Sequence, residues 1–199
     1  EKAWPYNTPM PAGMLVDGQA GSPVVSNNYI YQNKVYGVKF EEFNGSFVGN
    51  TVKQNGLEWE TGFGSVSDLK VGAGLVIAST MHATFSGNTI TENRWGIYLN
   101  NATVPVNYNS YHLNINGNTI TNNEGDGIWI DSTVGRTIMI SGNNISDNGL
   151  SSTSTDSSTW IFCGVRVSTS ATAAGNAKII VVGNSFLNNV SIINLGTGG

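Results

Sequence analysis

Acidic side chains are the residues of this sequence with the clearest potential for chemistry, and three of them lie in one short stretch. Hydrolysis of a glycosidic bond needs two carboxyl groups about 5–9.5 Å apart, a distance that residues on neighbouring coils of a stacked repeat would supply. The same stretch is flanked by glycines and aromatic residues. We therefore predict three catalytic candidates, Asp126, Glu124 and Asp131.

Asp126 is the best single candidate among them. Gly125 and Gly127 flank it, so we expect its carboxyl group to be sterically open. The alternative is a corner aspartate that only bonds local backbone amides. Glu124 has a similar alternative, because Arg94 should stand directly before it in the repeat and neutralise it.

Aromatic residues could bind a sugar beside these acids. Tyr98 and Trp129 occupy equivalent outward positions of the repeat described below, and flat aromatic faces suit the apolar faces of sugar rings. We predict that the pair forms the exposed floor of a groove, although it could equally be a cross-strand pair covered by a loop or a second subunit. The predicted substrate-binding residues are Tyr98, Trp129, Arg94, Arg166, Trp59, Trp160 and Tyr108.

The two histidines, His82 and His112, each lie six residues before a repeated asparagine, so we expect them to stack on adjacent coils. A metal would need a third ligand, and the same column continues as Asn44 and Thr137, which are weak ligands. A solvent-facing pair is the simpler interpretation. We predict no metal and no cofactor.

A repeated sequence pattern must position these residues. The spacing N-x-hydrophobic-x-x-N occurs six times, with an apolar residue three positions before each first asparagine. The asparagine pairs are Asn28 and Asn33, Asn50 and Asn55, Asn88 and Asn93, Asn118 and Asn123, Asn143 and Asn148, and Asn184 and Asn189.

A glycine-led strand follows five of these six units. Its pattern, Gly-hydrophobic-x-hydrophobic, has the period of two that marks a strand with one buried face. The outward residues of these strands, read from unit to unit, are Lys39, Val76, Tyr98, Trp129 and Arg166. Three insertions, Gly56 to Ala73, Asn100 to Tyr111 and Gly149 to Cys163, could wall a groove beside this column.

A unit of three short strands cannot bury its apolar face alone, so the units must stack into a coil that closes on itself. The shortest unit runs 22 residues, from Asn28 to Asn50. We expect the repeated asparagine to tolerate the left-handed backbone of a sharp corner. Its side-chain amide should also bond to the equivalent amide one turn away, giving a ladder.

The composition excludes several classes of protein. The chain has 199 residues, 25 glycines and a similar number of asparagines, which disfavours helices. Its 39% of hydrophobic residues disfavour disorder, and its net charge of -4 disfavours nucleic-acid binding. No stretch approaches the roughly 20 apolar residues of a membrane span, so we expect no membrane insertion.

The repeat resembles that of the right-handed parallel β-helix proteins of the pectate-lyase-like superfamily, which includes polysaccharide lyases, polygalacturonases and phage tailspikes. The resemblance implies an all-β solenoid of about six coils, spanning residues 23–195. Residues 1–22 would be an extended lead-in or cap, and residues 196–199 a flexible end. The chain has no adjacent Asp-Asp, His-Gly or Arg-x-Lys of the polygalacturonase pattern, and no acidic cluster like the calcium site of pectate lyases.

This resemblance favours a tailspike-like function. We expect an extracellular, cell-surface or virion protein that binds a polysaccharide or other glycan and forms a homotrimer. If it is an enzyme, we expect it to be a polysaccharide lyase or a glycoside hydrolase. One alternative is a structural shaft or adhesin module, suggested by an apolar outer strip of Val24, Met139, Ile180 and Val182. A weaker alternative is ice binding, suggested by the Thr-x-Thr pairs at Thr89 and Thr119, although ordinary β-propensity explains these pairs better.

Overall fold

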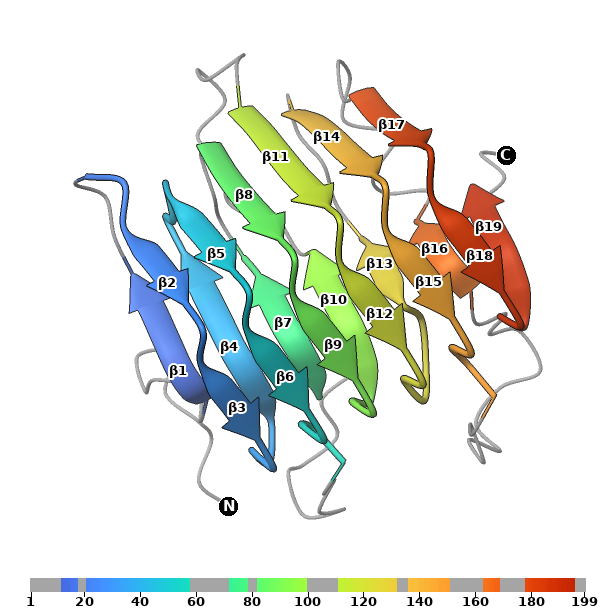
Figure 1. The fold of residues 1–199 in the computed structure, drawn as a ribbon, viewed down its shortest axis with the longest axis horizontal. Coiled ribbons are helices and arrows are strands. Elements are labelled where there is room, and N and C mark those ends of the chain that lie inside the picture. Colours follow the sequence, from blue (N-terminus) through green and yellow to red (C-terminus); the bar gives the residue numbers. More distant parts are fainter. Residues whose placement is uncertain are drawn as a thin grey trace, which may run out of the picture.

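Short parallel strands build the whole described part of the chain. The structure is a computed structural model, and it describes residues 12–17, 21–57, 72–78, 82–99, 111–131, 136–150, 163–168 and 178–195. Every element assigned in these ranges is a β-strand, and successive strands turn through three sheets before each new coil begins (Figure 1). None of the described residues forms a helix with the length and apolar character that a membrane crossing requires.

The three sheets run along the long axis of the rod, and each coil gives one strand to each of them. Sheet A contains, in spatial order, β1 (Ala12–Asp17), β4 (Tyr36–Glu41), β7 (Ala73–Ile77), β10 (Trp95–Leu99), β13 (Ile128–Ile130), β16 (Cys163–Val167) and β19 (Ser191–Leu195). Sheet B contains β2 (Val24–Ser26), β5 (Ser46–Val48), β8 (His82–Ser86), β11 (Tyr111–Asn116), β14 (Arg136–Ser141) and β17 (Lys178–Val182). Sheet C contains β3 (Tyr29–Tyr31), β6 (Thr51–Lys53), β9 (Thr89–Thr91), β12 (Thr119–Thr121), β15 (Asn144–Ser146) and β18 (Ser185–Leu187).

The predicted all-β parallel solenoid is therefore confirmed. The parallel pairing begins before the expected start of the solenoid, because β1 pairs with β4 along the edge of sheet A. Residues 12–17, expected to belong to a lead-in, thus supply a strand to the rod.

Columns of apolar residues fill the interior of the coil. On sheet C the middle residues of the asparagine motif stand in register from strand to strand: Ile30, Val52, Ile90, Ile120, Ile145 and Phe186. Sheet B adds a second column: Val25, Phe47, Phe85, Ile115, Ile140 and Val181. Each fully buried side chain of this kind contributes about 1.5–3 kcal/mol relative to exposure, so the repeat itself supplies the core.

Two asparagine ladders run along the rod at the corners on either side of sheet C. Asn118 is typical: its Oδ1 accepts bonds from the backbone N and the Nδ2 of Asn88, both 2.9 Å away. Its own Nδ2 donates to the Oδ1 of Asn143 and to the carbonyl oxygen of Phe85, both also at 2.9 Å. The predicted ladder is confirmed, and it satisfies polar groups that the corners bury.

The predicted backbone of the ladder asparagines is wrong. The left-handed residue of each corner is the one directly before the asparagine, and its φ lies between 52° and 66° at these positions: Asn27, Gln32, Gly49, Gln54, Gly87, Glu92, Gly117, Asn122, Gly142, Asp147, Gly183 and Asn188. The asparagine itself is needed for its side chain. Glycine, which carries no penalty for positive φ, therefore precedes five of the six first asparagines.

Candidate functional site

The candidate site lies on the outer face of sheet A, where the outward residues follow the predicted order. Tyr98 stands beside Val76 on one side and Trp129 on the other, and Trp129 stands beside Arg166. The register of the column is therefore as the glycine-led strands predicted. Period-two alternation places these side chains outside the coil, opposite the aliphatic core.

The expected exposure of the aromatic pair is wrong. Tyr98 and Trp129 are each only 2% exposed, within a buried cluster of Tyr36, Ala73, Val76, Trp95, Tyr98 and Trp129 that we call the outer aromatic cluster. The ring centroids of Tyr98 and Trp129 lie 5.0 Å apart, and those of Trp95 and Trp129 lie 5.7 Å apart. Large rings on adjacent coils pack against one another at such distances and so remove their own faces from water.

Sequence reasoning missed three members of this cluster, Tyr36, Ala73 and Trp95. All three lie directly before the glycine of a glycine-led strand, and Ala73 aligns with each of the other two in sheet A. Asp126 and Cys163 hold the same position before Gly127 and Gly164. The residue before the glycine was thus the signal that would have found this second column.

Asp126 is buried rather than open, which corrects the steric prediction. Its side chain is 0% exposed, its Oδ1 accepts a 2.7 Å hydrogen bond from the backbone N of Cys163, and its Oδ2 lies 3.4 Å from Nη1 of Arg166. Burial raises the pKa of the Asp126 carboxyl to about 7, while Arg166 and the bond from Cys163 oppose that rise. Desolvation outweighs the attraction because the charged form loses more solvation than one cation returns.

The two glycines beside Asp126 leave no open space around its carboxyl group, because other coils lie close to both of them. A Cβ on Gly125 would lie 2.3 Å from Nε1 of Trp95, and a Cβ on Gly127 would lie 2.8 Å from the carbonyl oxygen of Gly164. Both positions are therefore glycine because neighbouring coils approach closely. That Nε1 atom of Trp95 is buried without a hydrogen-bond partner among the described residues.

Neutralisation of Glu124 by Arg94 is supported. Glu124 is half-buried, and burial raises the pKa of its carboxyl while the positive charge of Arg94 opposes the rise. The Arg94 guanidinium also lies 5.2 Å from the centroid of the Trp95 ring. An arginine over a tryptophan face is attracted by the ring quadrupole, so the Trp95 ring helps to hold the charge that acts on Glu124.

Asp131 and Arg166 also contact the outer aromatic cluster, Asp131 through a hydrogen bond and Arg166 through the face of a ring. The hydroxyl of Tyr98 donates to Oδ2 of Asp131 at 3.1 Å, and the Arg166 guanidinium lies 4.8 Å from the centroid of the Trp129 ring. Trp129 donates from Nε1 to the Oγ of Ser168 at 2.8 Å. The fold thus brings together all three acids and both arginines of the prediction around one buried aromatic cluster.

The structure describes the two histidines of the prediction but not its three other aromatic residues. Trp59, Trp160 and Tyr108 lie outside the described residues, as do most of the three insertions expected to wall a groove. His82 and His112 stack as predicted, with ring centroids 5.6 Å apart and an interplanar angle of 29°. No three His, Cys, Asp or Glu side chains in the described ranges are grouped so as to hold a metal ion.

Two family models match the chain. One, described as a right handed beta helix region, matches residues 73–199, and the other, described as periplasmic copper-binding protein (NosD), matches residues 6–109. No curated protein and no solved structure matches the chain significantly. The second family places the protein in the extracellular space or the periplasm. Since each model matches more than half of the chain, the protein belongs to the right-handed parallel β-helix family and, over its N-terminal half, to the NosD family.

Proposed function

We propose that this protein binds carbohydrate through the outer face of sheet A. The observation that supports the proposal is a set of three half-buried charged side chains in contact with the outer aromatic cluster, Arg94, Asp131 and Arg166, together with half-buried Glu124 beside the charge of Arg94. Planar charged groups offer paired hydrogen bonds to adjacent sugar hydroxyls. Ring contacts hold Arg94 and Arg166, and a hydrogen bond from Tyr98 holds Asp131, so less side-chain entropy is lost when a sugar binds.

In this proposal the buried rings have a different role from the one the sequence suggested. Tyr98 and Trp129 support the charged groups from beneath, and Arg94, Arg166, Glu124 and Asp131 contact the sugar. A sugar-binding role for Trp59, Trp160 and Tyr108, which lie outside the described residues, stays a prediction. Cleavage of the polysaccharide by Glu124, Asp131 and Asp126 stays a prediction, which product analysis of the bound polysaccharide tests.

Arginine substitutions test the binding site. We expect Arg166→Gln and Arg94→Gln each to weaken glycan binding at least 10-fold, because a charge-assisted hydrogen bond contributes about 1.5–3 kcal/mol. The control is Lys178→Gln, which removes the same charge from an exposed residue of sheet B. Glycan-array binding, followed by titration of the best ligand, gives the affinities. Unchanged affinity in both arginine variants would contradict the assignment.

A second candidate function is a structural shaft or adhesin module that assembles, as a homotrimer, through sheet B. Val24, Met139 and Val182 are exposed apolar side chains on its outer face, which favours a protein interface there. Met139→Glu should then dissociate the oligomer, as measured by mass in solution across a range of concentrations. A monomeric wild type would contradict this candidate.

Copper is the ligand that the printed name of the NosD family suggests. Copper sites need several nitrogen or sulfur ligands that converge on one point. The stacked pair of His82 and His112 has no third such ligand grouped with it among the described residues. These residues do not fit a copper site, and we assign none.

A further inference from the structure

Two exposed tyrosines lie on the outer face of sheet C, whereas the rings of the outer aromatic cluster are buried. Tyr29 and Tyr31 flank the inward Ile30 of β3 and are 60% and 52% exposed. Their ring centroids lie 5.1 Å apart, and the rings are tilted by 47°. Two exposed rings that lean toward one another offer one face for stacking and a second ring at its edge.

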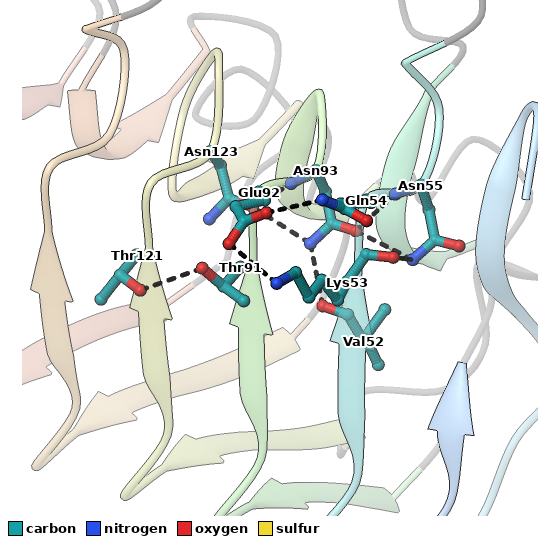
Figure 2. A network of polar contacts seen from close by, with 9 residues as sticks. All are labelled: Val52, Lys53, Gln54, Asn55, Thr91, Glu92, Asn93, Thr121 and Asn123. Carbon is teal, nitrogen blue, oxygen red and sulfur yellow. Dashed lines mark hydrogen bonds and ion pairs between the residues drawn. The ribbon is translucent and has the colours of Figure 1, made fainter. Parts of the chain in front are cut away.

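A polar network adjoins these rings on the next two coils. Lys53 pairs with Tyr31 in the register of sheet C, and its Nζ lies 3.1 Å from Oε1 of Glu92. The Nε2 of Gln54 donates to the other carboxylate oxygen of Glu92 at 2.8 Å (Figure 2). Glu92 therefore holds an ammonium and an amide side by side on the outer surface.

The corners of the coil fix this network. Gln54 and Glu92 are equivalent left-handed residues, with φ of 55° and 54°, and each directly precedes a ladder asparagine. Figure 2 shows the side chains of Lys53, Gln54 and Glu92 gathered beside the ladder formed by Asn55 and Asn93. Buried hydrogen bonds of the ladder thus fix the two corners that carry Gln54 and Glu92, and Lys53 directly precedes the first of these corners.

We propose that Tyr29, Tyr31, Lys53, Gln54 and Glu92 form a second sugar site, separate from sheet A and specific for an uncharged pyranose. The inference rests on the proposed carbohydrate-binding function. The rings take the apolar C–H face of the sugar, as exposed aromatic side chains do. Lys53 and Gln54 supply donors and Glu92 supplies an acceptor for the hydroxyls.

The preference for an uncharged sugar follows from the charges of the network. Lys53 and Glu92 neutralise one another at 3.1 Å, so the site carries no net charge that would attract a uronate. A carboxylate on the sugar would also compete with Glu92 for the ammonium and would be repelled by it. A hydroxyl can accept from Lys53 and donate to Glu92 without disturbing the pair.

Calorimetric titration with neutral hexasaccharides of gluco, manno and galacto configuration, and with matching uronate oligomers, tests this inference. We expect Tyr29→Ala/Tyr31→Ala to weaken binding of one neutral oligosaccharide at least 10-fold and Tyr29→Phe/Tyr31→Phe to retain it, because the ring faces carry the contact. Thr89→Ala, on the same face, is the control. Both tyrosines are exposed, so unchanged thermal unfolding should accompany the loss.

The variants separate this inference from the proposed function. Loss in the tyrosine variant with full binding in both Arg166→Gln and Arg94→Gln supports the sheet C site and contradicts the sheet A site. Loss in the two arginine variants with full binding in the tyrosine variant does the reverse. Full binding by the Ala double variant, binding of uronate oligomers only, or no sugar binding by the wild type would overturn the inference, and the last of these would overturn both proposals.

Discussion

The ladder asparagines of the inner coils use their whole side chains. In the interior of the rod the Oδ1 accepts two bonds from the preceding coil, and the Nδ2 donates both to the next asparagine and to a carbonyl of the preceding coil. Aspartate would lose the donors and glutamine would not reach the same atoms. The repeated asparagine is therefore explained by hydrogen bonding along the rod axis and not by corner geometry.

Asn118→Ala should lower the free energy of unfolding by roughly 3–5 kcal/mol, because several buried donors and acceptors each lose a partner at about 1–3 kcal/mol. Asn114→Ala is the matched control, since Asn114 lies in the same strand, is half-buried and faces outward. Urea unfolding of both variants measures the difference. A cost for Asn118→Ala equal to that for Asn114→Ala would contradict the ladder's contribution.

Asp126 should make stability depend on pH. Its pKa rises from an ordinary 3.8 to about 7 in the fold, so the folded state holds the proton more tightly than the unfolded chain. The stability that this group contributes is fully present below about pH 4 and is lost as pH rises through 7. The total loss is on the order of 4 kcal/mol.

Asp126→Asn removes this titration while keeping an oxygen that can accept from the backbone N of Cys163. We expect the variant to gain stability relative to the wild type as pH increases from about 4 to about 7, with little further gain at higher pH, by chemical unfolding at each pH. Other titrating groups cancel in the difference between the two proteins. Parallel stability curves would show that Asp126 is ionised throughout.

The close approach of neighbouring coils explains the glycine of each glycine-led strand. A Cβ on Gly96 would lie 2.3 Å from the carbonyl oxygen of Gly127, and a Cβ on Gly74 would lie 2.9 Å from that of Gly96. The ladder that contains Asn123 also lies close, because Nδ2 of Asn123 would be 3.1 Å from the same Cβ on Gly96. Stacked coils therefore leave no room for a side chain in this column.

Gly96→Ala should accordingly destabilise the fold by at least 2–3 kcal/mol through overpacking against backbone that cannot move aside. Gly87→Ala is the control, because Gly87 has φ +62° and nothing within 4 Å of a Cβ. Its cost should be only about 1 kcal/mol, which is the strain of a left-handed alanine. Equal thermal destabilisation by the two variants would mean that the close approach is relaxed in solution.

The sequence predicted the strands and their register better than it predicted which residues pack against each side chain. Period-two alternation and the recurring asparagines placed Tyr98 beside Trp129 correctly, because strand register follows from a repeat. They could not reveal that Trp95 packs on the same rings or that it fills the space beside Gly125, since a pattern says which side of a strand a residue faces and not what covers it. The same alternation rule accounts for the outward position of Tyr29 and Tyr31 on either side of Ile30, but it does not indicate that they stay exposed.

The whole molecule behaves as a stack in which each coil depends on its neighbours. Phe85, Ile115 and Ile140 of the sheet B column are fully buried, whereas Val25 and Val181 at its two ends are only partly buried. The ladders show the same gradient, because Asn118 bonds to coils on both sides in buried surroundings and the bond from Asn28 to Asn50 is only partly buried. Stability in such a stack is close to a sum of coil and interface terms, so the ends should open first.

Amide hydrogen exchange measures this gradient directly. The backbone N–H of Asn118, bonded to Oδ1 of Asn143 at 2.9 Å, should exchange only through global unfolding, and its protection should equal the full free energy of unfolding. The N–H of Asn28, bonded to Oδ1 of Asn50 at the same 2.9 Å, should exchange through local opening of the first coil and at least 10-fold faster. Because the two hydrogen bonds are equal in length and type, position along the rod is what separates them. Equal protection at the two sites would mean that the coils unfold as one cooperative unit.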